Sequence, residues 1–240
     1  MARTIQTAIN LIKNGQFKRA MSSTLMYSAI PYYKHHLKNH SYSYPESLEF
    51  SWNSYHSLIK PAQKKPEIKQ FLELIKKRKP KTFLEVGTGK GGTLFLFCSV
   101  LPKNARIVTL DMRGGSYGAG YPPMMRELIR HYRQGNQQLE LVEGDSHNET
   151  TKNFIEHLFK SEKIDFLFID ADHTYEGAKK DFELYSQLVR KGGTIALHDI
   201  KAYEQGCGVY KLWNELKRKY KTSEIVDKEN PYGIGIVEWE

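Results

Sequence analysis

Two short clusters of Asp and His residues each follow an apolar stretch of the chain. The first is Asp170-Ala-Asp-His173, and the second is His198-Asp199. Carboxylate oxygens are the ligands that Mg²⁺ prefers, so Asp170 and Asp199, with His198 beside them, are candidate metal ligands. A neutral imidazole can take a proton from a hydroxyl group, which makes His173 a candidate base. The same residues also suit structural roles as turn residues, helix caps or hydrogen-bonded histidines.

A glycine-rich turn precedes these clusters and follows another apolar stretch. It runs Glu85-Val-Gly87-Thr88-Gly89-Lys-Gly91-Gly92. Glycines leave little side-chain bulk, so the backbone of such a turn can approach a ligand closely. The glycine spacing does not identify the ligand by itself, because it also satisfies the Gly-x-Gly-x-x-Gly pattern of dinucleotide loops, and a tight structural turn needs no ligand.

Three acids stand around this turn. Glu85 lies two residues before the first glycine, Asp111 ends the second apolar stretch, and Asp145 ends the third. A carboxylate after a second strand can accept both hydrogen bonds from a ribose diol, and one after a third strand can receive an adenine amino group. The acids therefore fit adenosine, although Gly144-Asp145 alone also suits a turn and helix cap.

The elements that must position these residues alternate between strands and helices from residue 66 onward. Such alternation predicts a doubly wound, mostly parallel, seven-stranded Rossmann-like α/β sheet, whose carboxyl edge binds ligands. The last two strands are joined by a stretch too short for a crossover helix, so we expect an antiparallel C-terminal hairpin. The expected strands are Thr82–Val86, Arg106–Leu110, Leu139–Glu143, Asp165–Ile169, Gly193–Leu197, Thr222–Val226 and Ile234–Val237. Helices are expected near Pro66–Lys79, Thr93–Leu101, Pro123–Gln134, Thr151–Lys160, Gly177–Val189 and Val209–Lys219.

The N-terminal part, residues 1–65, is expected to be a helical extension and lid, with the catalytic domain at 66–240. Apolar spacing within 1–40 predicts two basic amphipathic helices with a break at Ile30-Pro31, and the polar segment His40–Tyr55 is expected to be a loop. The aromatic segment ending at Gln63 is expected to close over the cofactor.

Basic charge is concentrated at the N-terminus. Residues 1–80 hold 14 Lys and Arg against 4 Asp and Glu, whereas the whole chain carries +9. This segment suits a polyanion, acidic lipid, a cover for the active site or a homo-oligomer contact, and a solvated helix face is the plain alternative. No stretch is long and apolar enough to span a membrane, and two cysteines give no disulfide framework. A cytoplasmic protein is expected, with peripheral membrane contact left open.

The residues quoted above resemble the signature of class I S-adenosylmethionine (SAM)-dependent methyltransferases over residues 66–240. The pattern is Glu-x-Gly-x-Gly-x-Gly, an acid after the second strand and Gly-Asp after the third. The resemblance implies SAM, with Glu85 and the glycines near its methionine part and Asp111 on its ribose. The remaining expected cofactor contacts are Thr88, Asp145 and Asp170.

A longer pattern resembles a narrower group, the macrolide-sugar O-methyltransferases and cephalosporin hydroxylase-like proteins. It consists of Asp170-Ala-Asp-His-x-Tyr-x-Gly-x-x-x-Asp181, a Gly-Gly turn, His198-Asp199 and Gly208-Val-Tyr-x-x-Trp213. The group implies Mg²⁺ on Asp170 and Asp199 and a base at His173. His198 departs from the group, which carries another acid there, and imidazole is a poorer ligand for Mg²⁺.

The favoured function is a divalent-metal-assisted O-methyltransferase acting on a hydroxyl of a sugar, glycan or glycosylated small molecule. An RNA methyltransferase is the enzyme alternative; nucleic acid is disfavoured because no aromatic-rich RNA-binding signature is visible. A non-catalytic SAM- or nucleotide-binding protein and a nicotinamide dehydrogenase are further alternatives.

Overall fold

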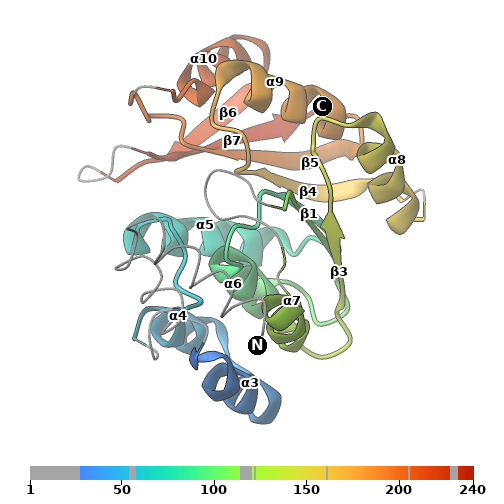
Figure 1. Cartoon of the computed structure of the whole chain (residues 1–240). Helices are drawn as coiled ribbons and strands as arrows, with labels where there is room; N and C mark the ends of the chain where they lie inside the picture. The colour runs from blue at the N-terminus through green and yellow to red at the C-terminus, as the bar shows by residue number, and fades with distance from the viewer. Residues whose placement is uncertain are drawn as a thin grey trace, which may run out of the picture.

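The computed structural model describes residues 28–53, 58–113, 121, 123–160, 162–204, 206–227 and 232–240. Its centre is a seven-stranded sheet with the order β3-β2-β1-β4-β5-β7-β6 (Figure 1). The first five strands run parallel, whereas β7 pairs antiparallel with both β5 and β6. The strands are β1 (Thr82–Val86), β2 (Arg106–Asp111), β3 (Gln138–Glu143), β4 (Ile164–Ile169), β5 (Val189–His198), β6 (Lys221–Ile225) and β7 (Ile234–Trp239).

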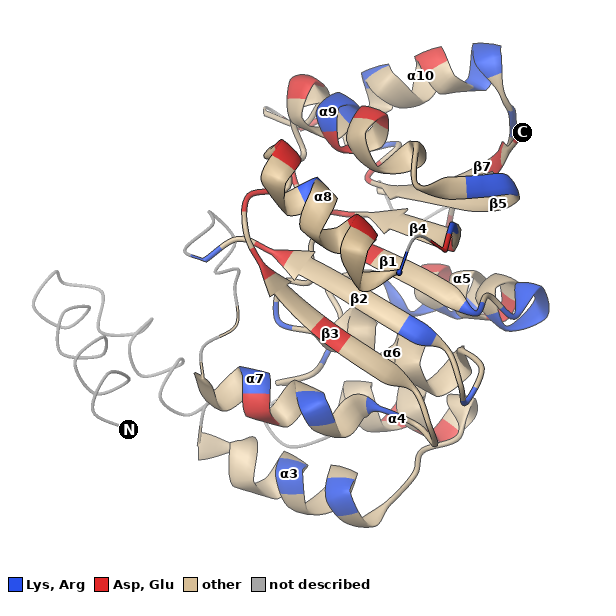
Figure 2. Cartoon of the chain, turned by 90° about the vertical axis from the view of Figure 1, so that its right-hand side faces the viewer, with Lys and Arg blue, Asp and Glu red and all other residues tan. Residues whose placement is uncertain are grey.

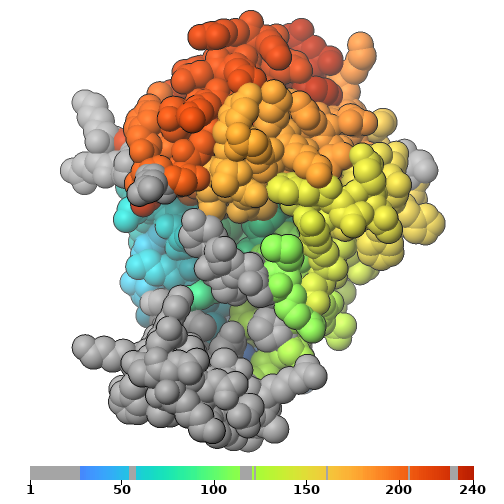
Figure 3. Space-filling model, turned by 45° about the horizontal axis from the view of Figure 1, so that its top comes forward, coloured from blue at the N-terminus to red at the C-terminus, as the bar shows by residue number. Residues whose placement is uncertain are grey.

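Helices cover both faces of the sheet because successive strand residues point to opposite sides. In β1, for example, Phe83 belongs to one buried cluster and Leu84 to the other. The first cluster is shared with α3 (Ile30–Asn39), α4 (Tyr44–Asn53), α5 (Lys65–Arg78), α6 (Gly92–Val100), α7 (Pro123–Ile129) and the 3₁₀ turn η2 (Arg130–Tyr132). The second is shared with α8 (Glu149–Leu158), α9 (Tyr175–Ser186) and α10 (Val209–Lys219). Figure 3 shows the α8 segment, in yellow, directly beside α9, in orange.

The strand order shows where this sheet can bind a ligand. The chain leaves β1 toward β2 on one side, whereas β4 pairs with β1 on the other. This reversal is a topological switch point, where open α/β sheets bind ligands beyond the carboxyl ends of their strands. The predicted fold class, including the C-terminal hairpin, is confirmed.

The segment His40–Tyr55, predicted as a loop, contains helix α4 instead. Glu46, in the first turn, fixes the start of this helix, because the backbone N–H and the hydroxyl of Ser43 both donate to its Oε2, at 2.9 and 2.7 Å. Tyr44 and Leu48 are buried in the same cluster as Phe95 of α6. Burial of these side chains outweighs the polar composition on which the loop prediction rested.

The Ile30-Pro31 junction begins a helix rather than only ending one. Pro31 stands in the first turn of α3, where its missing N–H costs nothing. Tyr33 of α3 is completely buried in the cluster shared with α5–α7. The more N-terminal of the two predicted basic helices lies outside the described residues. None of the described helices has the length and apolarity needed to cross a membrane.

Candidate active site

A cavity of about 520 Å³ opens at the carboxyl ends of β1, β2 and β4. This volume lies in the usual range for a small-molecule site. Six of the residues singled out from the sequence line it: Gly87, Gly89, Asp111, Asp145, Asp170 and His173. Met112, Gly144, Ser146, His147, Ala171, Asp172, Thr174 and Gly206 also line it.

The turn after β1 needs glycine at two positions for different reasons. Gly87 has φ +95°, and a Cβ there would lie 2.0 Å from the carbonyl oxygen of Asp170, so the two loops touch backbone to backbone. Gly89 has φ +55°, but a Cβ there would meet no atom within 4 Å. Its open side and its place in the lining show that the cavity begins directly at Gly89.

Asp111 is hydrogen-bonded to this turn. Its Oδ2 accepts the backbone N–H of Thr88 at 3.0 Å and of Gly89 at 2.6 Å, and Oδ1 accepts that of Met112 at 2.7 Å. The acid after β2 therefore fixes the turn after β1 and also lines the cavity.

Asp145 lies across the cavity from the glycine turn, on the loop after β3. Its Oδ1 accepts the backbone N–H of His147 at 2.9 Å, and the side chain is exposed. Asp145 therefore stabilises a turn, as the sequence suggested, and also lines the cavity.

Glu85 sits behind the cavity rather than in its lining. The residue is completely buried, Oε2 accepts a hydrogen bond from the Thr109 hydroxyl at 2.5 Å, and Oε1 has no hydrogen-bond partner among the described residues. Burial raises the pKa of Glu85 to about 8. Thr88 and Gly91 are also absent from the lining; the Thr88 hydroxyl pairs with that of Tyr121 at 2.7 Å.

Asp170, at the end of β4, is held by two side chains from other elements. Gln63 donates from Nε2 to Oδ2 of Asp170 at 2.7 Å, and its own Oε1 accepts the Thr93 hydroxyl at 2.8 Å. Gln63, at the end of the segment predicted to close over the cofactor, thus contacts Asp170 in the structure. On the other side, Nδ1 of His198 lies 3.1 Å from Oδ1 of Asp170.

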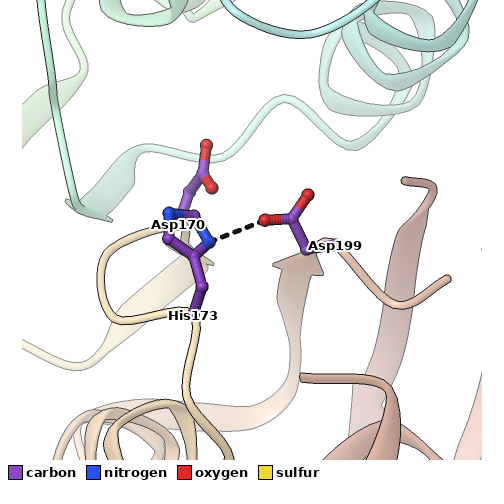
Figure 4. A group of neighbouring side chains, drawn as sticks. All are labelled: Asp170, His173 and Asp199. Atoms are coloured by element: carbon purple, nitrogen blue, oxygen red, sulfur yellow. Dashed lines mark ion pairs between the residues drawn. The ribbon is translucent and has the colours of Figure 1, made fainter. Parts of the chain in front are cut away.

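His173 and Asp199 form an ion pair between the loops after β4 and β5. Their Nδ1 and Oδ2 atoms lie 2.6 Å apart (Figure 4). The hydrogen bond with Asp199 raises the pKa of His173, although burial opposes the shift. Burial alone would raise the pKa of Asp199, but the bond from His173 and the charge of His198 hold it below its ordinary value. When Nδ1 donates to Asp199, the neutral ring carries its lone pair on Nε2.

His198 is surrounded by carboxylates. Besides Asp170, its Nδ1 lies 3.1 Å from Oδ1 of Asp199, and its Nε2 lies 3.1 Å from Oε1 of Glu67 on α5. Burial lowers the pKa of His198, but Asp170, Glu67 and Asp199 outweigh it and raise this pKa well above the ordinary value. Both ring nitrogens of this buried histidine therefore face carboxylates, an arrangement that favours the protonated ring.

Among the described residues, the group that fits a divalent cation contains His173 in place of His198. Asp170, His173 and Asp199 can each bring one ligand atom within 4.8 Å of the other two. Two carboxylates and an imidazole form a mixed oxygen and nitrogen ligand set. A cation there would compete with the existing His173–Asp199 pair for its ligand atoms.

Comparison with known proteins identifies the part of the chain that carries this geometry. Residues 84–200 match the family model described as a methyltransferase domain. This segment is a methyltransferase domain. It extends from β1 to the residue after Asp199, so it contains the glycine turn and both Asp/His clusters.

Two curated relatives match parts of this chain. Uncharacterized protein R132 of Acanthamoeba polyphaga mimivirus is 26% identical over 156 residues, which cover 65% of this chain and 66% of that protein. Tapetum-specific methyltransferase 1 of Arabidopsis thaliana is 28% identical over 125 residues, covering 51% of this chain and 48% of that protein. The chain therefore spans less than two thirds of these relatives.

The fold of the methyltransferase domain has a counterpart among solved structures. An O-methyltransferase from Bacillus cereus in complex with SAH superposes with a TM-score of 0.57 and 20% identity. The match covers 80% of this chain and 90% of that one. At this identity, the likeness concerns the fold.

Proposed function

We propose that this chain is a SAM-dependent O-methyltransferase that acts on a hydroxyl group of a sugar, glycan or glycosylated small molecule. One observation carries the proposal: a single cavity joins the glycine turn, two acids suited to adenosine, and His173, which is paired behind the lining with Asp199. The fold shared with a Bacillus cereus O-methyltransferase that holds SAH supports SAM as the donor.

The donor binds on the side of β1, β2 and β3. Gly87 and Gly89 let the cofactor approach the backbone, which is the use that nucleotide-binding folds make of such turns. Asp111 faces the ribose and Asp145 the adenine, in accordance with their places after β2 and β3. Glu85 acts from behind by fixing Thr109 under the turn rather than by touching the cofactor.

The acceptor binds on the side of β4 and β5. Neutral His173 removes the proton from the acceptor hydroxyl through Nε2, while Asp199 stabilises the imidazolium that forms. The hydroxyl oxygen then attacks the methyl carbon of the sulfonium, the bond from carbon to sulfur breaks, and SAH leaves with both electrons of that bond on sulfur. Asp170, clamped by Gln63 and His198, adds negative charge beside the base.

Hydrogen-bonding side chains in the cavity lining support a polyhydroxylated acceptor. Asp172 and Thr174 stand on either side of His173 in the chain, and Ser146 and His147 also line the cavity. Each of these four side chains can donate or accept hydrogen bonds.

A divalent cation is a second candidate for activating the hydroxyl, and the Asp170–His173–Asp199 group favours it. Such a cation would lower the pKa of the acceptor hydroxyl. His173 cannot be both a ligand and the base through the same nitrogen, so the two candidates exclude one another at that atom. Full turnover after dialysis against a chelator supports the base, whereas turnover that is lost and restored by Mg²⁺ or Mn²⁺ supports the cation.

Calorimetry with SAH tests the donor site. Gly89→Arg fills the open side of the turn and should abolish measurable binding of SAH. Gly89→Ala brings the same backbone strain, because alanine must also adopt the positive φ, but it does not fill the cavity and should retain most of the binding. Equal loss in both variants would attribute the effect to backbone strain. Binding of NAD but not SAH by the unaltered chain would overturn the proposed function.

Methyl transfer from labelled SAM tests the acceptor class. Free sugars, nucleotide sugars and oligosaccharides form one panel, and catechol and a structured RNA serve as comparisons. Label in the sugar panel alone supports the proposed class. Label only in catechol or only in RNA would reject it while leaving the methyltransferase itself intact.

A further inference from the structure

A second hollow lies away from the active site, between α3 and the turn that follows α7. It has a volume of about 490 Å³ and lies open on the surface. Lys38 of α3 borders it on one side, and Arg130, His131 and Arg133 border it on the other. We call these four residues and the hollow between them the basic groove. Figure 2 shows the Lys and Arg positions of α3 below those of α7 and η2 on one face.

The Lys and Arg side chains of the basic groove have no ion-pair partner within the described part of the chain. Lys38, Arg130 and Arg133 are exposed, and none forms a salt bridge to a described residue. No described Asp or Glu lines the groove. Burial, and then the positive charge of Lys34, lower the pKa of His131. Lys34 itself is paired with Glu127.

The basic groove is built on a fixed turn. The buried side chain of Gln137 donates from Nε2 to the carbonyl oxygens of Cys98, Leu101 and Pro102, at 2.9, 3.2 and 3.2 Å. Its Oε1 accepts the backbone N–H of Gln134 at 2.8 Å. Nε of Arg133 donates to the carbonyl oxygen of Arg130 at 3.1 Å, which leaves the terminal guanidinium nitrogens for another partner.

We propose that the basic groove binds the phosphate of an anionic phospholipid headgroup and thereby holds the enzyme at a membrane surface. Guanidinium groups suit phosphate because their N–H donors match its oxygens. A lipid fits better than a soluble phosphate compound because the groove is open, and the polar atoms of its buried Gln137 are already used. The same side of the molecule bears α3, which belongs to the segment that holds the excess basic charge.

Sedimentation with vesicles tests the proposal on the full chain. Vesicles of phosphatidylcholine alone are compared with vesicles that also contain phosphatidylglycerol, at low and at physiological salt. The test variant is Arg130→Gln/Arg133→Gln. The matched control is Arg218→Gln/Lys219→Gln, which removes the same charge from exposed positions at the end of α10, on the other face of the sheet. Thermal unfolding and SAH binding check that both variants remain folded.

The unaltered chain should bind only the vesicles with phosphatidylglycerol, and more weakly as salt rises. Each basic residue near an anionic surface contributes about 1 kcal/mol, so the test variant should bind roughly 30-fold more weakly, and the control should lose much less. Equal losses in both variants would show attraction to net charge alone and overturn the proposal. Calorimetric binding of pyrophosphate without vesicle binding would overturn the lipid assignment, as would tighter binding of an RNA oligonucleotide through the same arginines.

Discussion

Oε1 of Glu67, in the first turn of α5, lies 3.1 Å from Nε2 of His198 at the end of β5. Both side chains are buried, and the other oxygen of Glu67 accepts the backbone N–H of Gly233 at 2.8 Å. One carboxylate thus joins the helix before the methyltransferase domain, the strand that ends at His198, and the C-terminal hairpin. The contact also fixes His198, which in turn holds Asp170.

Glu67→Ala should therefore destabilise the fold strongly. The substitution leaves Nε2 of His198 and the backbone N–H of Gly233 without their acceptor, and breaking a buried ion pair costs about 3–5 kcal/mol. Chemical denaturation should show that loss in the free energy of unfolding. Glu49→Ala, which removes an exposed ion pair with Lys65, is the control and should change little. A similar small change for both would show that Glu67 is not essential to the packing around His198.

His173→Ala should lower kcat by about 10²- to 10⁴-fold, the range that a general base contributes, while the affinity for SAH stays the same. Single-turnover methyl transfer and calorimetry measure the two quantities separately. His157→Ala, at an exposed position near the end of α8, should leave both unchanged. An unchanged kcat in His173→Ala would show that His173 is not the general base.

The pH dependence of kcat should reflect the pKa of His173, which depends on its hydrogen bond with Asp199. Only the neutral imidazole acts as a base, so kcat should rise with pH through the pKa of His173, which the hydrogen bond with Asp199 raises above 6.5. Asp199→Asn removes the negative charge and leaves at most a weaker, neutral hydrogen bond, so the midpoint should move to lower pH. A midpoint that stays in place in this variant would mean that another group controls the rate.

Glu85 should make the fold less stable as pH rises. Its pKa is about 8 in the folded chain and near 4.5 in the unfolded chain, so the folded state binds the proton more tightly and loses stability between these pH values. Glu85→Gln removes the titrating group and keeps the hydrogen-bonding shape. The difference in the free energy of unfolding between Glu85→Gln and the unaltered chain should increase in favour of the variant from pH 5 to pH 8. It should reach a few kcal/mol and then level off. Denaturation at several pH values measures it, and an advantage independent of pH would contradict the assignment.

Much of the fold and of the cavity could be predicted from the sequence because both follow from short-range patterns. The apolar stretches mark the strands, and the polar residues directly after them must meet at the carboxyl edge of a parallel sheet. Asp111, Asp145, Asp170 and His173 were found in this way and do line one cavity. The residues that hold these four side chains in place were not all predicted.

Glu67 was missed because a glutamate in the first turn of a helix is expected there for the helix dipole and indicates no distant partner. Its role depends on contacts with His198 and Gly233, far along the chain. The basic groove was missed for a related reason. Counting charge along the chain locates the basic excess in residues 1–80, but Arg130 and Arg133 join it only because α3 packs against α7 and η2.

The close approach of the Gly87 backbone to the Asp170 carbonyl ties the turn after β1 to the loop after β4. On the proposed function, a shift of this contact would move the donor and the acidic residue beside the acceptor together. A change of acceptor would then leave the contact in place and alter loops beyond it, such as residues 172–174. The distance between the methyl donor and His173 would be set by the ends of β1 and β4.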